Sequence, residues 1–174
     1  LSSHIEKNKS FGVKNGGLLL LNWETMEVLA NIGSKNYYDD EIQGKVNITT
    51  SKRSPGSTLK PFIYALALEQ GLIHYSTMLK DTPQAFNEYA PDNYGNTFKG
   101  PVQAWFALAD SRNIPAVSLA QQISSPDLYD FLQQAQISNL KNKEHYGLSI
   151  VLGSAEVSML ELTRLYAMLA NNEI

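Results

Sequence analysis

The pattern of apolar and polar positions predicts a hairpin near the start of the chain. Apolar runs over residues 17–22 and 27–33 flank the turn-like residues 23–26, which is typical of a β-hairpin. Four consecutive leucines in the first run favour a strand covered on both faces. Residues 1–15 are polar and without a period, so we expect an irregular approach segment. Residues 34–54 are expected to form a long loop or short edge strands.

The strongest helical signal covers residues 57–70. Its apolar residues occupy every phase of a helical wheel, which is typical of a buried helix, and Gly71 stands where a glycine commonly ends one. Residues 73–100 contain several prolines and glycines and are predicted to be loop. Four more helices are predicted over residues 101–109, 115–123, 126–135 and 159–170. The first three of them begin with a proline, which suits a first helical turn. Before the last one, Ser158 and Glu161 form a capping box.

Together these elements predict an α+β fold, in which helices flank an antiparallel sheet and the helix after Ser57 crosses the core. The 174 residues contain neither an internal repeat nor a domain linker, so we expect one domain or a large part of one. Because 43% of the residues are hydrophobic, intrinsic disorder is excluded as the main state. The chain starts at Leu1 and follows a helical pattern to its last residues, which favours an excised fragment.

Composition excludes several function classes. The formal net charge is −3, and the basic pair Lys52-Arg53 is too small a patch to predict nucleic-acid binding. The lack of cysteine excludes disulfide scaffolds, thiolate zinc sites and cysteine nucleophiles. The three histidines lie in unrelated polar contexts without ligand spacing, so we expect no metal site. Apolar runs are far shorter than the roughly 18 residues of a membrane span.

Ser57-Thr58-Leu59-Lys60 is the strongest candidate for chemistry. Ser57 lies in the first turn of the predicted helix, where unpaired N–H groups and the positive dipole end suit a nucleophile whose attack creates an oxyanion. Lys60 follows three residues later on the same face, within hydrogen-bond reach of the hydroxyl. On an otherwise apolar helix its ammonium is desolvated, which favours the neutral amine. A neutral lysine beside a serine can act as general base to a nucleophile.

The spacing alone does not establish this site. Ser138 and Lys141 repeat it in a polar stretch that we interpret as a solvated loop. The context of Ser57 differs, because a Pro-Gly turn precedes it and an apolar helix with one cation follows it. A buried lysine without a partner is costly, which favours a functional reading of this copy.

Ser111 and Asn113 form the second candidate. They lie two residues apart between the predicted helices 101–109 and 115–123, where a hydroxyl and an amide can point together into a cleft. The serine could relay a proton while the asparagine holds both lysine and substrate. The alternative is an ordinary turn or helix cap, and residues 34–36 repeat the pattern in such a setting.

Residues 53–64 resemble the active-site block of bacterial penicillin-binding proteins, and residues 111–117 resemble their second motif. The likeness covers nearly the whole chain, and it is greatest to the transpeptidase domain of the bifunctional class A proteins of the 1C type. Further similar segments are residues 21–30, 71–73, 81–83, 89–94 and 152–171.

This resemblance implies a peptidoglycan D,D-transpeptidase that works without a cofactor through an acyl-serine intermediate. It implies Ser57 as the nucleophile, with its backbone N–H as an oxyanion donor, and Lys60 as the general base. It implies Ser111 as the proton relay to the leaving amine and Asn113 as the residue that positions the lysine and the substrate. The implied partners are peptidoglycan stem peptides, β-lactam antibiotics as covalent inhibitors, and a glycosyltransferase domain in the same parent chain.

Two features depart from the wider superfamily pattern. Arg112 stands where the β-lactamase form has aspartate, which favours the penicillin-binding branch over the hydrolases. Neither Lys-Thr-Gly nor Lys-Ser-Gly follows Asn113, although such a third motif normally binds the substrate carboxylate and supplies an oxyanion donor. We therefore expect residues 1–174 to be a partial domain without its final strands, and inactive alone, because one oxyanion donor typically contributes about 2.7 to 4 kcal/mol.

Two other functions stay open at this point. A non-catalytic sensor of β-lactams or muropeptides would keep the serine and signal from the acyl form. A serine β-lactamase would add a positioned water and base for fast deacylation. The leading hypothesis predicts an extracytoplasmic, periplasmic location, with the parent protein anchored in the bacterial inner membrane.

Overall fold

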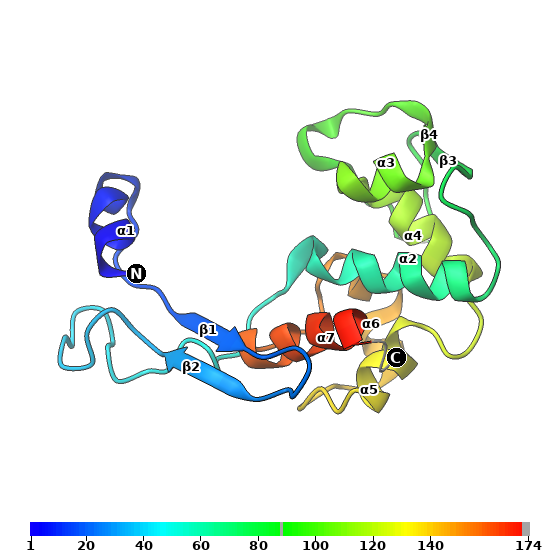
Figure 1. The fold of residues 1–174 in the computed structure, drawn as a ribbon. Coiled ribbons are helices and arrows are strands. Elements are labelled where there is room, and N and C mark those ends of the chain that lie inside the picture. The colour runs from blue at the N-terminus through cyan, green and yellow to red at the C-terminus, as the bar shows by residue number, and fades with distance from the viewer. Residues whose placement is uncertain (88, 172–174) are drawn as a thin grey trace. The chain divides into compact units, whose positions relative to one another are not determined.

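The computed structural model describes residues 1–87 and 89–171, which divide into two compact units (Figure 1). Unit 1 comprises Leu1–Arg53 and Val157–Ile174, and unit 2 comprises Ser54–Glu156. Helices accompany two small antiparallel sheets, one in each unit, so the predicted α+β class is confirmed.

Unit 1 is built on the predicted hairpin. Strand β1 (Leu18–Leu21) pairs antiparallel with β2 (Val28–Ile32), and helix α7 (Met159–Asn171) packs against β1. The predicted capping box is confirmed: Ser158 N donates to Glu161 Oε2 at 2.7 Å, and Glu161 N donates to Ser158 Oγ at 3.2 Å. Since these bonds satisfy backbone and side-chain groups at the helix start, they define where α7 begins.

Residues 34–54 form a long loop, which was one of the two predicted alternatives; the other was short edge strands. Its end is fastened by a backbone bridge between Arg53 and Val157 and by an ion pair from Lys52 to Glu161 at 2.7 Å. Thr49 is buried in the loop, and its hydroxyl donates to Asn31 Oδ1 at 2.9 Å. The loop is therefore held by side-chain contacts together with this isolated backbone bridge.

Two expectations for unit 1 are wrong. Residues 1–15 contain helix α1 (Ser2–Lys7) and the 3-10 helix η1 (Lys9–Phe11), with Ile5 as a buried anchor that the absence of a period concealed. The leucine strand is not covered on both faces, because Leu18 and Leu20 are 41% and 53% exposed. Leu19 and Leu21, on the opposite face of β1, are half-buried.

Unit 2 is arranged around helix α2 (Lys60–Glu69), which continues from the 3-10 helix η2 (Gly56–Leu59). The predicted buried helix is thus present, although its first turn is tighter than an α-helix. Gly71 ends it with φ +69°, and the N–H of Leu72 donates back to Ala67 O at 2.9 Å, as in a Schellman motif. Further helices of unit 2 are α3 (Ala104–Ala109), α4 (Asn113–Gln122), α5 (Leu128–Gln134), α6 (Lys143–Tyr146) and η4 (Gly147–Leu152).

The prediction that residues 73–100 are loop is wrong in part. They contain β3 (Met78–Asp81), which pairs antiparallel with β4 (Gly100–Gln103), and the short helix η3 (Tyr94–Asn96). Pro101 therefore lies in a strand, and α3 begins three residues later than predicted. A proline is tolerated in an edge strand because the N–H that it lacks needs no ladder partner there.

The approach of η2 to the end of η4 leaves no room for a side chain. Ser54 Oγ donates to Gly153 O at 2.7 Å, and a Cβ atom built on Gly153 would lie 2.3 Å from Gly56 N. Gly153 also has φ +94°, a backbone conformation that favours glycine. The turn that carries Ser57 is therefore packed backbone to backbone against Gly153.

We expect Gly153→Ala to lower the free energy of unfolding by more than Gly71→Ala. Both glycines have positive φ, but a Cβ atom on Gly71 meets nothing within 4 Å. Gly71→Ala should therefore cost only the left-handed strain of roughly 1 to 2 kcal/mol. Gly153→Ala adds the displacement of the Gly56 backbone. Urea unfolding of both variants measures the difference, and equal losses would contradict the tight approach.

Candidate active site

Ser57 and Lys60 lie one turn apart at the start of α2 but in different environments. Pro55 and Gly56 form the turn before them, and Gly56 has φ +55°, which a residue with a side chain adopts only with strain. Ser57 is exposed, whereas Lys60 is only 1% exposed. The Ser57 hydroxyl forms no hydrogen bond with any residue that the structure describes, so its proton and lone pairs are available for chemistry.

The Lys60 ammonium is held by three oxygen atoms of the second candidate motif. Nζ donates to Ser111 O at 2.6 Å, to Ser111 Oγ at 3.2 Å and to Asn113 Oδ1 at 2.6 Å. An ammonium has three N–H donors, so these contacts satisfy all of them. The structure thus joins Lys60 with Ser111 and Asn113, which lie more than 50 residues further along the chain, in one hydrogen-bonded cluster.

Burial and, as a smaller effect, the positive charge of Arg112 together lower the pKa of Lys60 from its ordinary value of 10.5 to about 8. Within the described residues no carboxylate forms an ion pair with Lys60, so a negative charge does not offset these two effects. The neutral amine expected from the apolar sequence context is therefore accessible near neutral pH.

The turn that presents Ser111 and Asn113 is held by strained backbone. Ser111 has φ +53°, which is uncommon for a residue with a side chain and is frequent at functional sites. Its N–H donates to Leu108 O at 3.0 Å, so the turn directly follows α3. Asn113 is the first residue of α4, and its amide donates from Nδ2 to Asp92 O at 2.6 Å. The bond from Nδ2 to Asp92 O orients the Asn113 amide so that its Oδ1 points toward Lys60.

Sequence reasoning missed the residues that support this turn. Asp81 is fully buried at the end of β3 and accepts from Arg112 Nε at 2.8 Å and from Asn93 Nδ2 at 2.7 Å. Asn93 Oδ1 in turn accepts from the backbone N of Asn113 at 2.8 Å. Asp81 and Asn93 lie inside segments that carried the family resemblance, which was the available signal, although no role was attached to them.

The residues set aside during sequence analysis lie at the surface. Ser138 and Lys141 are exposed, so their copy of the Ser-x-x-Lys spacing is a solvated loop as predicted. His4, His74 and His145 are also exposed. Among residues 1–87 and 89–171, no group of three or more acidic, histidine or cysteine side chains is placed to hold a metal ion. No helix in the same ranges has the length and apolar character needed to cross a membrane.

Comparison with known proteins gives consistent matches. The family model described as the penicillin binding protein transpeptidase domain matches residues 16–174. Penicillin-binding protein 1C of Escherichia coli is 33% identical over 156 residues, which are 89% of this chain and 20% of that protein. Penicillin-binding protein 1A of Rickettsia conorii is 31% identical over 90% of this chain. The chain thus spans about a fifth of the length of these curated relatives.

Solved structures agree with this result. A crystal structure of penicillin-binding protein 1A from Haemophilus influenzae superposes with a TM-score of 0.76 at 31% identity, over 88% of this chain and 23% of that chain. The PonA1 protein of Mycobacterium tuberculosis, solved in complex with penicillin V, has a TM-score of 0.76 at 19% identity, which shows a shared fold. It covers 97% of this chain and 48% of the other. The chain belongs to the family of penicillin-binding protein transpeptidase domains.

Proposed function

We propose that this chain carries the acylation machinery of a peptidoglycan D,D-transpeptidase, in which Ser57 is the nucleophile and Lys60 the general base. One observation carries the proposal: a buried lysine with a lowered pKa lies one turn after an exposed serine, and Ser111 and Asn113 hold its amine. Membership of the transpeptidase family supports the same reaction class.

In the proposed reaction, the neutral Lys60 amine takes the proton from Ser57 Oγ as this oxygen attacks the penultimate D-alanine carbonyl carbon of a donor stem peptide. The carbonyl oxygen becomes an oxyanion that the Ser57 backbone N–H stabilises. The C–N bond to the last D-alanine then breaks, and Ser111 donates its proton to the leaving amine while it accepts from Lys60 the proton that came from Ser57. This leaves the peptide as an ester on Ser57. An acceptor amine from a neighbouring stem then attacks the ester carbonyl carbon and gives up a proton to Lys60. The C–O bond to Ser57 breaks as the cross-link forms, and Ser57 Oγ regains that proton.

The Ser111 hydroxyl has the bonding freedom that a proton relay needs. Its contact to Lys60 Nζ at 3.2 Å is the longest of the three that the amine makes. A hydroxyl both donates and accepts, so Ser111 can accept from the ammonium and donate to the neutral amine. The two 2.6 Å contacts to Ser111 O and Asn113 Oδ1 can persist in both protonation states. The cluster can therefore move one proton without losing its geometry.

The remaining parts of the proposal concern the parent protein. A β-lactam would acylate Ser57 in place of the stem peptide, and its opened ring would stay attached and block the acceptor. The Lys-Thr-Gly or Lys-Ser-Gly motif that completes such a site does not occur in residues 114–174, so we propose that other parts of the parent supply it. We also propose that the parent carries a glycosyltransferase domain and works at the periplasmic face of the inner membrane.

We expect Ser57→Ala to abolish labelling of the full-length parent by a fluorescent penicillin, because no nucleophile remains. Lys60→Met should lower the acylation rate constant by roughly 100- to 10,000-fold, which is the usual contribution of a general base. Gel fluorescence measures the label, and mass spectrometry of the labelled peptide identifies its site.

Ser138→Ala is the matched control, because Ser138 has the same spacing to a lysine but is exposed. Its labelling should equal that of the unchanged protein. Persistent label on Ser57→Ala would overturn the site assignment. Label that disappears within seconds would point instead to a β-lactamase, and stable label without cross-linked product from stem peptides would point to a sensor.

The lowered pKa of Lys60 predicts a specific dependence of stability on pH. The folded pKa of about 8 lies below the ordinary 10.5, so between these values the unfolded chain binds more protons than the folded chain. The free energy of unfolding should therefore rise with pH through this window, by up to about 1.4 kcal/mol per pH unit. Urea unfolding at a series of pH values measures it. The Lys60→Met variant should lack this rise, and parallel curves for the two proteins would contradict the prediction.

A further inference from the structure

We propose that Asp81 is a positioning residue of this site: its buried carboxylate holds the Ser111–Asn113 turn against Lys60 through Arg112 and Asn93. This inference rests on the proposed function of the Lys60 cluster. Asp81 does not touch Lys60 or Ser57 in the described structure, so it acts through other residues and not in the reaction itself.

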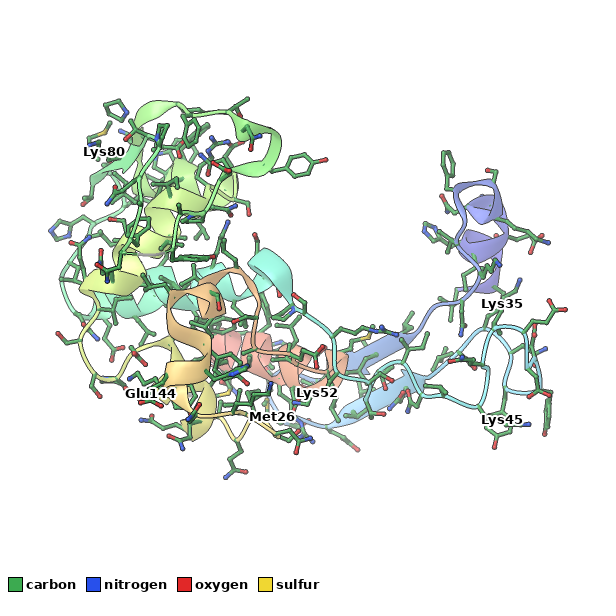
Figure 2. All side chains as sticks on the ribbon, turned by 180° about the vertical axis from the view of Figure 1, so that it is seen from behind. Met26, Lys35, Lys45, Lys52, Lys80 and Glu144 are labelled. Carbon is green, nitrogen blue, oxygen red and sulfur yellow. The ribbon has the colours of Figure 1, made fainter. Side chains whose placement is uncertain are left out.

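Each oxygen of the Asp81 carboxylate has its own partners. Oδ2 accepts from Arg112 Nε at 2.8 Å and from the backbone N of Lys99 at 3.0 Å, while Oδ1 accepts from Asn93 Nδ2 at 2.7 Å. The strand explains this placement, because successive residues of β3 point to opposite faces. Asp81 is fully buried, whereas its neighbour Lys80 lies at the surface of unit 2 (Figure 2).

Two routes lead from this carboxylate to the oxygens that hold Lys60. On the first, Oδ2 binds Arg112, which is the middle residue between Ser111 and Asn113 and is itself buried. Arg112 Nη2 also donates to Thr97 O, so the guanidinium is held from two sides. On the second route, Oδ1 orients Asn93, whose own oxygen accepts from Asn113 N at 2.8 Å. The turn is thus held at its middle residue and at the start of α4.

The strained backbone of Ser111 makes such support necessary. A left-handed residue with a side chain persists only where its surroundings over-determine it, because strain of this kind costs on the order of 1 to 3 kcal/mol. If Arg112 were released, the turn could relax toward an ordinary conformation. Ser111 O and Asn113 Oδ1 would then leave the positions 2.6 Å from Lys60 Nζ.

The charges around Lys60 give this proposal a signature in a pH profile. Arg112 lowers the pKa of Lys60, and Asp81 lies against Arg112 and compensates its charge. Asp110 also faces Arg112, at 3.5 Å, and pairs with Lys99 at 3.1 Å. Tyr64 lies one turn after Lys60 on α2, and burial, followed by the charge of Asp81, raises the pKa of its phenol, so it stays neutral.

The other elements packed against α2 add little charge. In the part of the chain that the structure describes, η2, α3, α4 and η4 carry no charged residue within their bounds. Helix α5 carries Asp130, and Asp127 caps its start; both carboxylates are paired with Lys143. Beside the Lys60 cluster, Asp81 and Arg112 are the buried charges, whereas Asp110 lies nearer the surface and is shared with Lys99.

The test uses Asp81→Asn in the full-length parent, with acylation by a fluorescent penicillin measured from pH 6 to 10. Asparagine keeps the size of the side chain but loses the charge that binds Arg112. We expect the acylation rate constant per folded protein to fall by about 100-fold, the loss that a displacement of about 1 Å can cause. The midpoint of the alkaline rise should move to lower pH, because the uncompensated charge of Arg112 disfavours protonated Lys60.

Arg112→Gln supplies the opposite shift. It removes the positive charge and leaves that of Asp81, so the midpoint should move to higher pH while the rate constant also falls. This variant keeps the proposal testable if Asp81→Asn does not fold. Asp127→Asn is the matched control: it removes a carboxylate charge that pairs with Lys143, while asparagine can still cap α5. It should leave the rate constant per folded protein and the midpoint unchanged.

The outcomes separate this inference from the proposed function. If the unchanged protein is not acylated on Ser57, the proposed function fails, and a crystal structure of Asp81→Asn still tests the positioning role. We expect that structure to show the 2.6 Å contacts from Lys60 Nζ to Ser111 O and Asn113 Oδ1 lost. If the protein is acylated but Asp81→Asn and Arg112→Gln both behave like Asp127→Asn, Asp81 is a structural residue and the inference is overturned.

Discussion

The burial of one amine is the constraint on which the rest of unit 2 depends. Lys60 is 1% exposed on a helix whose other buried residues are apolar except for Tyr64, and an ammonium in such surroundings is unfavourable unless its donors are satisfied. The chain meets this requirement with three oxygens from Ser111 and Asn113 and not with a carboxylate. A neutral set of acceptors satisfies the donors without returning the pKa to its ordinary value, so the same arrangement permits burial and keeps the amine available as a base.

This arrangement is accompanied by strain in the backbone at Ser111. Ser111, which places both a main-chain oxygen and a side-chain oxygen on this amine, has a left-handed φ of +53°. Two buried residues that are distant in sequence contact the neighbours of Ser111. Asp81, at the end of β3, binds Arg112, and Asn93, in a loop, binds the backbone N of Asn113. Polar groups that are all satisfied can make such a network rigid, and a rigid network keeps the three oxygens in place around the Lys60 amine.

The parts that sequence analysis predicted correctly depend on local patterns. The apolar phase of residues 57–70, the glycine at position 71 and the capping box at Ser158 each act within one or two helical turns. The pairing of β3 with β4 could not be predicted, because it joins residues about 20 positions apart and places Pro101 in a strand. The exposure of Leu18 and Leu20 could not be predicted either, because it depends on which elements pack on each face of β1. The cluster of Lys60, Ser111 and Asn113 could be anticipated because its two motifs are short, whereas Asp81 reads as one more acidic residue until the fold buries it.

The Ser111-Arg112-Asn113 segment has two sides, and this division explains why its middle residue differs in chemistry from the outer two. Ser111 and Asn113 turn their oxygens to Lys60, while Arg112 turns away to Asp81 and Thr97. The middle position therefore anchors the turn, and its charge must match whatever β3 presents. An aspartate there, as in the β-lactamase form, would face the carboxylate of Asp81 at close range, and two buried like charges repel strongly. Arginine at position 112 and aspartate at position 81 are thus best understood as one unit, which no motif that spans only three residues can describe.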